Sequence, residues 1–467
     1  MQIETGRIHL PPYTWRGNTR HGICGSGTRQ QRVRSVEPTH DIDFLVREVE
    51  IGEDAKNISS REGGVFREVQ KLFIPQKAVT EDYLLYQLWT FPSHVFGWMS
   101  HSLAGSSMLK ALGVGSGPAD AVGLSAAIKW ITKDGIGAAG RLFVGGKLGY
   151  MFDEDPKRWR MIAEIFTTTG LFLEIATQVS PNDFVVLAGG GTIAKALGSG
   201  IGRPCFRVIQ THFAVENNIG DVSAKEEVWE TSAQLVGIAA SVALLSALET
   251  LGIPEAVVPA WFGVQAIHVA IRYHSLKVLC FPWPNFKRGT MISSCYITTD
   301  AVPSIQDVSY QERMFQTPTS LNNGTQCIFG SRWSETVGSR HTEEISGILR
   351  LYGSEKYVLV IDAYGVIRVL LWVDATGVDL MRALLQACWI DEHTTVEDGY
   401  THFQDLQLMN SSYSYMTRVF EDFERKAKEQ GWDFERTILP LHECNTRLEK
   451  VDYHRKESNI VHTQNQF

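Results

Sequence analysis

Apolar residues recur at helical spacing over residues 80–282. The pattern is broken there by clusters of glycine, whereas strands would be separated by short polar turns. The last third of the chain contains two β-rich runs around a turn at Asp362–Gly365, and helical patterns follow at 378–390 and 414–432. The pattern therefore predicts a mainly α core with a hydrophobic helical hairpin, plus a small C-terminal α+β domain.

The clearest helix signals lie in the middle of the chain. The S-x-x-E sequence at 223–226 matches a capping box, in which the serine and the glutamate side chains each bind a free backbone N–H of the first turn. The G-x-P sequence at 252–254 is a typical helix stop. Together they predict one long helix from about Ala224 to Glu249.

This helix and the next one carry two uncharged runs, 231–248 and 256–271, which predict a hydrophobic hairpin over Thr231 to Ile271. A helix as long as the first run extends about 27 Å, close to the roughly 30 Å of a bilayer's hydrocarbon core. We expect the hairpin to lie in or against a membrane. The alternative is a hairpin buried in a protein core, because Pro259 and His268 interrupt the second run.

Composition divides the chain into four segments. Residues 1–40 are rich in arginine and hold almost no acids, so we expect a disordered basic tail, with an organelle transit peptide as the alternative. Residues 41–284 are the predicted helical core, opening with a short strand at 41–51. Residues 285–345, rich in Ser, Thr, Asn and Gln, are predicted to be an irregular connector, and 346–467 the α+β domain.

Charge and cysteine content narrow the classes of function. With 44 Lys+Arg against 52 Asp+Glu the net charge is -8, which argues against nucleic acid as a partner. The 7 cysteines include no C-x-x-C pair and do not indicate a disulfide framework, so we expect an intracellular, reducing compartment. Neither a zinc-binding H-E-x-x-H nor a G-x-S-x-G nucleophile motif occurs. We therefore predict no metal and no catalytic residue.

The segment 134–147, DGIGAAGRLFVGGK, has the glycine spacing G-x-G-x-x-G of a dinucleotide-binding loop. In such a loop a strand delivers the glycines to the N-terminus of a helix. Here the apolar spacing over 124–131 predicts a helix before the loop, where a dinucleotide-binding loop would follow a strand. The segment is therefore not expected to bind a dinucleotide. We expect these glycines to let helices pack closely, as the pair Gly198 and Gly202 also would. The loop glycines concerned are Gly135, Gly137 and Gly140.

The densest polar cluster, residues 211–227, comes directly before the hydrophobic hairpin. The first turn of a helix capped at Ser223 would offer free N–H groups and the positive end of the dipole, and a lysine there would add a point charge. This predicts a ligand or partner site for an anionic group such as phosphate. Its expected residues are His212, Asn218, Asp221 and Lys225. The alternative is a capping box with a local ion pair between Asp221 and Lys225.

Several motifs together carry a resemblance to a known family. They are KDGIGAAG at 133–140, the D-x-x-x-x-x-W-R step at 153–160, Glu174 with Pro181, and HFAVENNIGDVSAKEE at 212–227. These motifs, spread over about Phe73 to Ala240, resemble the root UVB sensitive family, whose domain is also called the vitamin B6 photo-protection and homoeostasis domain. The segment QGWDFERTILP, Gln430 to Pro440, is similar to the closing segment of that family.

The resemblance implies a part in vitamin B6 homeostasis and in the stress response to light, membrane association, and no established catalytic activity. We therefore expect a membrane-associated, non-enzymatic protein that carries or distributes a small metabolite, with pyridoxal phosphate as the candidate ligand. The membrane is the expected partner, together with self-association or another family member, in a mitochondrion or a plastid-like compartment. Two alternatives stay open: an enzyme acting on a B6-type phosphate compound, and an interaction scaffold that works through the α+β domain.

Overall fold

The structure is a computed structural model, and it divides the chain into two compact units, Met1–Leu72 and Phe73–Phe467. The residues that it describes are 29–35, 42–48, 71–113, 126–135, 149–316, 319–338, 340, 342–362, 364–393 and 402–441.

The first unit contains an antiparallel pair of strands, β1 (Arg29–Ser35) and β2 (Ile42–Glu48). Strand β2 confirms the strand predicted at 41–51. Strand β1 lies inside the segment predicted to be a disordered tail, so that prediction is wrong for these residues. Its polar sequence shows no alternation typical of a strand, and pairing with β2 supplies its backbone hydrogen bonds.

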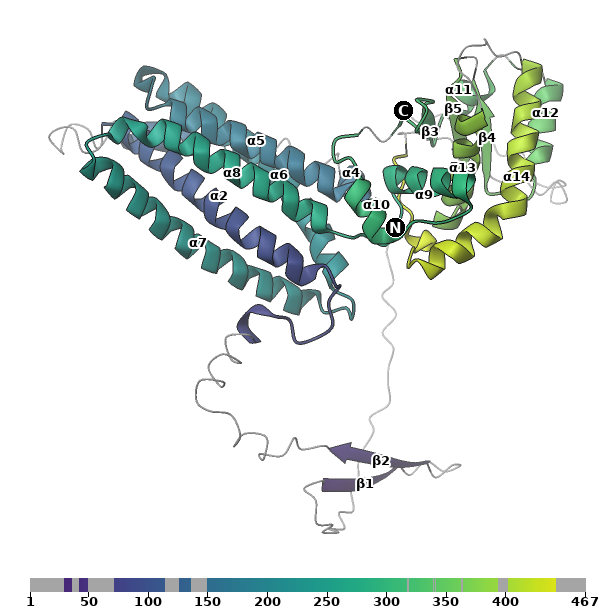
Figure 1. Cartoon of the computed structure of the whole chain (residues 1–467), viewed down its shortest axis with the longest axis horizontal. Helices are drawn as coiled ribbons and strands as arrows, with labels where there is room; N and C mark the ends of the chain where they lie inside the picture. The colour runs from purple at the N-terminus through teal and green to yellow at the C-terminus, as the bar shows by residue number, and fades with distance from the viewer. Residues whose placement is uncertain are drawn as a thin grey trace, which may run out of the picture. The chain divides into compact units, whose positions relative to one another are not determined.

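In the described part of the second unit, five long helices lie side by side as a bundle (Figure 1). Helix α5 packs along α6, and α2 packs against both α7 and α8. The mainly helical core predicted from the sequence is therefore confirmed. The long helices are α2 (Tyr83–Ala111), α5 (Pro156–Ala176), α6 (Phe184–Phe213), α7 (Ile219–Thr250) and α8 (Val257–Val278), and the short elements between them are α4 (Gly149–Glu154), η2 (Pro181–Asp183) and η3 (Pro254–Ala256).

Helix α7 begins five residues before the predicted start at Ala224, and its N-cap is Asn218. The predicted capping box is therefore wrong. The Glu226 side chain points into the bundle, where it accepts hydrogen bonds from Gln87 Nε2 (3.2 Å) and Gln210 Nε2 (2.7 Å). Because this carboxylate is held by tertiary partners, it is not available to cap the helix.

The faces of α7 are arranged in the opposite way from those of a soluble amphipathic helix. Its buried residues include Ala233, Gly237 and Ser241, and a Cβ added at Gly237 would lie 2.6 Å from the Val95 carbonyl oxygen of α2. Large apolar side chains point outward instead: Leu235, Val236, Ile238 and Val242 are exposed. Small residues at the interface and apolar residues outside are typical of helices that pack in membranes.

Helices α5 and α6 also meet through small residues. A Cβ added at Gly198 would lie 2.7 Å from the Ala163 carbonyl oxygen, and one at Gly202 would lie 3.4 Å from the Ala163 Cβ. The predicted close packing at Gly198 and Gly202 is thus confirmed. By length and composition, the segment Pro181–Phe213 and helix α7 are each able to span a membrane.

The glycine loop is only partly within the described residues. Residues 126–135 are helical, so the structure confirms that a helix leads into the loop. A Cβ added at Gly135 meets no described atom within 4 Å, so this glycine shows no close packing against the part of the chain that is described. Gly137 and Gly140 lie outside the described residues.

The C-terminal part combines helices with a small sheet of strand order β3-β5-β4, which confirms the predicted α+β character (Figure 1). Strand β3 (Cys327–Phe329) runs parallel to β5 (Ile367–Leu371), and β4 (Tyr357–Ile361) runs antiparallel to it. The helices are α9 (Phe286–Thr299), α10 (Ile305–Gln311), α11 (Trp333–Val337), α12 (Thr342–Leu351), α13 (Gly377–His393) and α14 (His402–Glu429), followed by η4 (Phe434–Arg436).

The predicted turn between β4 and β5 is confirmed. Asp362 Oδ1 accepts hydrogen bonds from the backbone N–H groups of Tyr364 (2.8 Å) and Val366 (3.0 Å). Gly365 has a φ of 75°, which a residue with a Cβ adopts only with strain. The side chain of Asp362 thus holds the turn that fixes the register of the two strands.

Residues 285–345 were expected to be irregular, yet they contain α9, α10, β3 and α11, and α12 begins at Thr342. Asn285 caps α9 by accepting from Arg288 N, and Ser304 caps α10 by accepting from Asp307 N. The buried side of α9 is unusually polar, including Lys287 and Arg288. Helical periodicity of apolar residues was therefore a poor guide here, because polar side chains occupy the buried face.

These polar side chains form a buried charge cluster that joins the bundle to the C-terminal part. Lys157 Nζ of α5 lies 2.9 Å from Glu312 Oε2, and Lys287 Nζ lies 2.6 Å from Asp155 Oδ2. Arg288 Nη1 is 3.8 Å from Glu312 Oε2. Burial raises the pKa of Glu312, but the cations, Lys157 foremost, outweigh it and lower the pKa to about 2.

Candidate functional site

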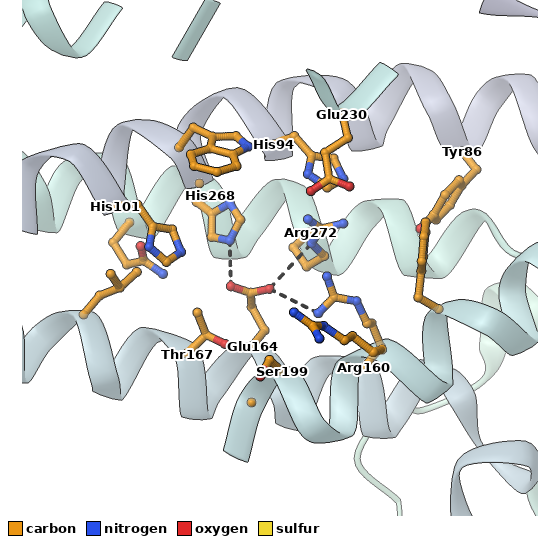
Figure 2. A pocket seen from close by; sticks show the side chains of 18 residues that line it. Tyr86, His94, His101, Arg160, Glu164, Thr167, Ser199, Glu230, His268 and Arg272 are labelled. Atoms are coloured by element: carbon orange, nitrogen blue, oxygen red, sulfur yellow. Dashed lines mark hydrogen bonds and ion pairs between the residues drawn. The ribbon is translucent and has the colours of Figure 1, made fainter. Parts of the chain in front are cut away.

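The helical bundle contains a cavity of about 460 Å³, lined by residues of α2, α5, α6, α7 and α8 (Figure 2). This volume is within the range of about 300–1,000 Å³ that is usual for small-molecule sites. Charged and imidazole side chains meet in the cavity from several helices, as Figure 2 shows. Titratable groups gathered in an interior cavity mark it as the candidate functional site.

Helical spacing places these side chains on common faces. On α5, Arg160, Glu164 and Thr167 follow one another at i, i+4 and i+7, so they lie on one side of the helix. On α8, His268 and Arg272 are four residues apart and also share a face. Because α5 packs against α8, the two faces meet inside the bundle.

Glu164 lies at the centre of the charged groups. Its Oε1 is 2.7 Å from His268 Nε2, and its Oε2 is 3.6 Å from Arg160 Nη1 and 3.7 Å from Arg272 Nε. Glu164, His268 and Arg272 are buried. One carboxylate therefore faces three cationic or potentially cationic groups.

The hydrogen bonds of His268 show where a proton is held. Its Nδ1 is 2.7 Å from the Ser93 carbonyl oxygen, which can only accept, so Nδ1 carries a hydrogen. Its Nε2 faces the Glu164 carboxylate at 2.7 Å, and this contact also needs a hydrogen. Whether the imidazole or the carboxyl group carries it, the His268–Glu164 pair has no net charge. The pair thus does not neutralise the charges of the neighbouring arginines.

Two buried donors in the cavity lack a hydrogen-bond acceptor among the described residues. Arg160 Nε and Arg272 Nε make no hydrogen bond to the described chain. The imidazoles of His94 and His101, both on α2, also line the cavity, and Arg203 adds a third guanidinium group. Guanidinium groups donate in a fork that matches the oxygens of phosphate or carboxylate. The arrangement is therefore suited to a small anion.

Two glycines leave room for the charged side chains. A Cβ added at Gly97 would lie 3.1 Å from the His268 ring, and one at Gly202 would lie 3.2 Å from Arg160 Nη1. Both contacts are tighter than ordinary packing, so a larger residue at either position would push the imidazole or the guanidinium aside. Sequence reasoning identified Gly202 only as a packing residue and missed Gly97.

Of the four site residues predicted from the sequence, His212 lies near the end of α6. Its Nε2 is 2.9 Å from Asp82 Oδ2, and its ring packs against Phe281 and Trp283. Asp82 also accepts a hydrogen bond from the Cys280 backbone N–H at 2.8 Å. His212 therefore takes part in a buried network that holds the residues before α2.

The other predicted residues lie at the start of α7. Asn218 Nδ2 donates to the Ala78 carbonyl oxygen (3.3 Å), and Asp221 Oδ2 accepts from the Gln76 backbone N–H (2.8 Å). Lys225 lies in the second turn of α7, not in the first as the capping box implied. None of the four predicted residues lines the cavity. That these four residues form a ligand or partner site stays a prediction.

The arginines, histidines and acids of the cavity were missed by sequence reasoning. The available signal was a charged or imidazole side chain inside otherwise apolar helices, of which His268 is an example. Among the residues that the structure describes, no group of three or more His, Cys, Asp or Glu side chains could hold a metal ion.

The chain thus combines a helical bundle that encloses a cationic cavity with a C-terminal α+β part. Two family models match the chain, the vitamin B6 photo-protection and homoeostasis domain over residues 59–300 and the C-terminal region of root UVB sensitive proteins over 301–445. The chain belongs to the root UVB sensitive family. The resemblance seen in the sequence motifs is confirmed.

Similar curated proteins include three from Arabidopsis thaliana. Protein root UVB sensitive 5 is 37% identical over 377 residues, covering 78% of this chain and 73% of that protein. Protein root UVB sensitive 3 is 25% identical, covering 82% of this chain and 86% of that protein. Protein root UVB sensitive 2, chloroplastic, is 27% identical, covering 77% and 80%. No solved structure matches this chain.

Proposed function

We propose that this chain is a membrane-associated, non-enzymatic protein that binds and distributes a small phosphate-bearing metabolite through the cavity of its helical bundle. One observation carries the proposal: Arg160 and Arg272 face the cavity with buried Nε donors that make no hydrogen bond to the described chain. Leaving such donors without a partner costs free energy, and a bound oxyanion would offset that cost. The description of the family's domain supports pyridoxal phosphate or a close relative as the ligand.

The other walls of the cavity suit a flat ring. Tyr86, Trp98 and Phe206 contribute aromatic surface beside the charged groups. Ligand sites commonly combine an apolar or aromatic wall with a few polar groups that fix orientation. An aromatic phosphate ester would place its ring against the aromatic side chains and its phosphate against the charged groups.

A second candidate function is an enzyme that acts on a B6-type phosphate compound. It is favoured by the His268–Glu164 pair, which holds a proton in the wall of the cavity and thus has the parts of a general acid–base catalyst. Incubation of the full chain with pyridoxal phosphate distinguishes the enzyme from the carrier. If the vitamer is recovered unchanged, the result supports a carrier; if it is converted to a product, the result supports an enzyme.

The proposal is tested by titrating pyridoxal phosphate into the purified full chain and following its absorbance. We expect saturable binding at micromolar concentration, with pyridoxal, which lacks the phosphate, bound at least about tenfold more weakly because charge-assisted contacts to phosphate are lost. Equal affinity for the two compounds, or no saturation with either, would contradict the proposal.

Membrane association is supported by the outward apolar face of α7, on which Leu235 is 67% exposed and Val242 is 59% exposed. We expect the full chain to stay in the membrane fraction after extraction with alkaline carbonate, since this treatment removes proteins held by charge alone. Release into the carbonate supernatant as a monodisperse protein without detergent would show that the membrane assignment is wrong.

The partners and location follow from the same proposal. The membrane is the first partner, and self-association or pairing with another family member through the exposed apolar faces is the second. One relative is named chloroplastic, which supports a plastid-like compartment over a mitochondrion.

A further inference from the structure

Glu230 of α7 is the one lining carboxylate of the cavity, apart from the central Glu164 of α5, among the residues that the structure describes. Its carboxylate points into the cavity near Arg272 and His94 (Figure 2). It forms neither a hydrogen bond nor an ion pair with the described chain, whereas Glu164 contacts Arg160, His268 and Arg272. Burial, together with the nearby charge of Glu227, raises the pKa of Glu230, and Arg272 and Arg160 offset this only from beyond ion-pair distance. A cation in direct contact with the carboxylate would favour its ionised form.

The cavity is therefore bipolar. Arg160 and Arg272, whose charges the His268–Glu164 pair does not offset, form a cationic wall, and Glu230 adds a separate anionic group from another helix. A ligand that carried only negative charge would meet repulsion from Glu230. A ligand that carried only positive charge would meet repulsion from the arginines.

We propose that the ligand carries a protonated nitrogen as well as a phosphate group, and that Glu230 binds this nitrogen while the arginines bind the phosphate. This inference rests on the proposed function and names its substrate class: phosphate esters of small compounds with a basic nitrogen. The ring of Trp98, which also lines the cavity, favours the same class, because the face of an indole attracts a cation.

The test compares two probes on the full chain. Pyridoxamine phosphate carries an ammonium group and a phosphate, and phenyl phosphate carries a phosphate and no nitrogen. We expect Glu230→Gln to raise the Kd for pyridoxamine phosphate about tenfold, equivalent to about 1.4 kcal/mol. The Kd for phenyl phosphate should stay within about twofold or fall, because the repulsive charge has been removed. Glu249→Gln, which removes an exposed acid at the far end of the same helix, should leave both values unchanged.

A Glu230→Gln variant that weakens both probes equally, or neither, overturns the inference and leaves the proposed function standing. If this variant does not fold, the inference is tested on the wild-type protein by comparing the two Kd values. Pyridoxamine phosphate must then bind at least about tenfold more tightly than phenyl phosphate. Similar affinities for the two probes overturn the inference. If the wild-type protein binds neither probe, the proposed function falls and the inference falls with it.

Discussion

Replacing Arg272 by glutamine is expected to weaken the binding of pyridoxal phosphate by between about tenfold and 150-fold. A hydrogen bond to a charged group contributes about 1.5–3 kcal/mol, and Arg272 is buried in the cavity wall with an Nε donor that makes no hydrogen bond to the described chain. Glu164 would keep its contacts with Arg160 and His268, so the carboxylate is not left alone. The measurement is a titration of the full chain with the vitamer.

The matched control is Arg425→Gln, which removes the same charge from the exposed surface of α14, where Arg425 pairs with Asp422 and Glu429. This control should bind as the wild type does. A melting temperature close to that of the wild type would show that the Arg272→Gln protein is folded. Undiminished binding by a folded Arg272→Gln protein would exclude the arginine from the ligand site.

Replacing Glu312 by glutamine is expected to lower the free energy of unfolding by about 3–5 kcal/mol. The carboxylate is buried between Lys157, Lys287 and Arg288, and breaking a buried ion pair leaves charge without compensation. Denaturant unfolding of the full chain measures the loss. The surface pair of Glu424 and Lys428 supplies the control, because Glu424→Gln removes a solvent-exposed ion pair and should leave the free energy of unfolding nearly unchanged.

The pH dependence of stability provides a second readout of this cluster. The pKa of Glu312 is lowered from its ordinary value of 4.5 to about 2 in the folded chain. Its stabilising contribution is therefore fully present above the ordinary pKa, and it is lost as the pH falls toward 2. Glu312→Gln should flatten this part of the pH profile. A glutamine variant as stable as the wild type, with an unchanged profile, would contradict the role given to the cluster.

Local signals explain which parts of the fold could be predicted. The Asp362–Gly365 turn, both flanking strands and helix α13 were predicted because each has its own sequence pattern. The start of α7 was missed, since Glu226 of the supposed capping box binds Gln87 and Gln210 from other helices. Tertiary contacts of this kind leave no mark in a local pattern.

The cavity could not be predicted for a related reason. Each helix contributes one or a few polar residues, such as His94 from α2, Glu164 from α5 and Arg272 from α8. Each one stands out in its sequence as an isolated polar position, but only the packing of α5 against α2 and α8 brings them together. Arg160 was noted as part of the tryptophan–arginine step of the family resemblance, with no function attached to it. The phosphate site predicted from the sequence also relied on cationic groups, but at the end of α6 and the start of α7.

The central claim is that the bundle cavity holds a phosphate-bearing small molecule. Native mass spectrometry of the full chain, purified without added vitamers and run beside Arg272→Gln, tests this claim most directly. We predict that the wild-type protein retains a small molecule that releases phosphate on fragmentation, and that the folded variant does not. A wild-type protein that carries no such molecule and gains none when pyridoxal phosphate is supplied, or a variant that carries the same molecule to the same extent, would contradict it.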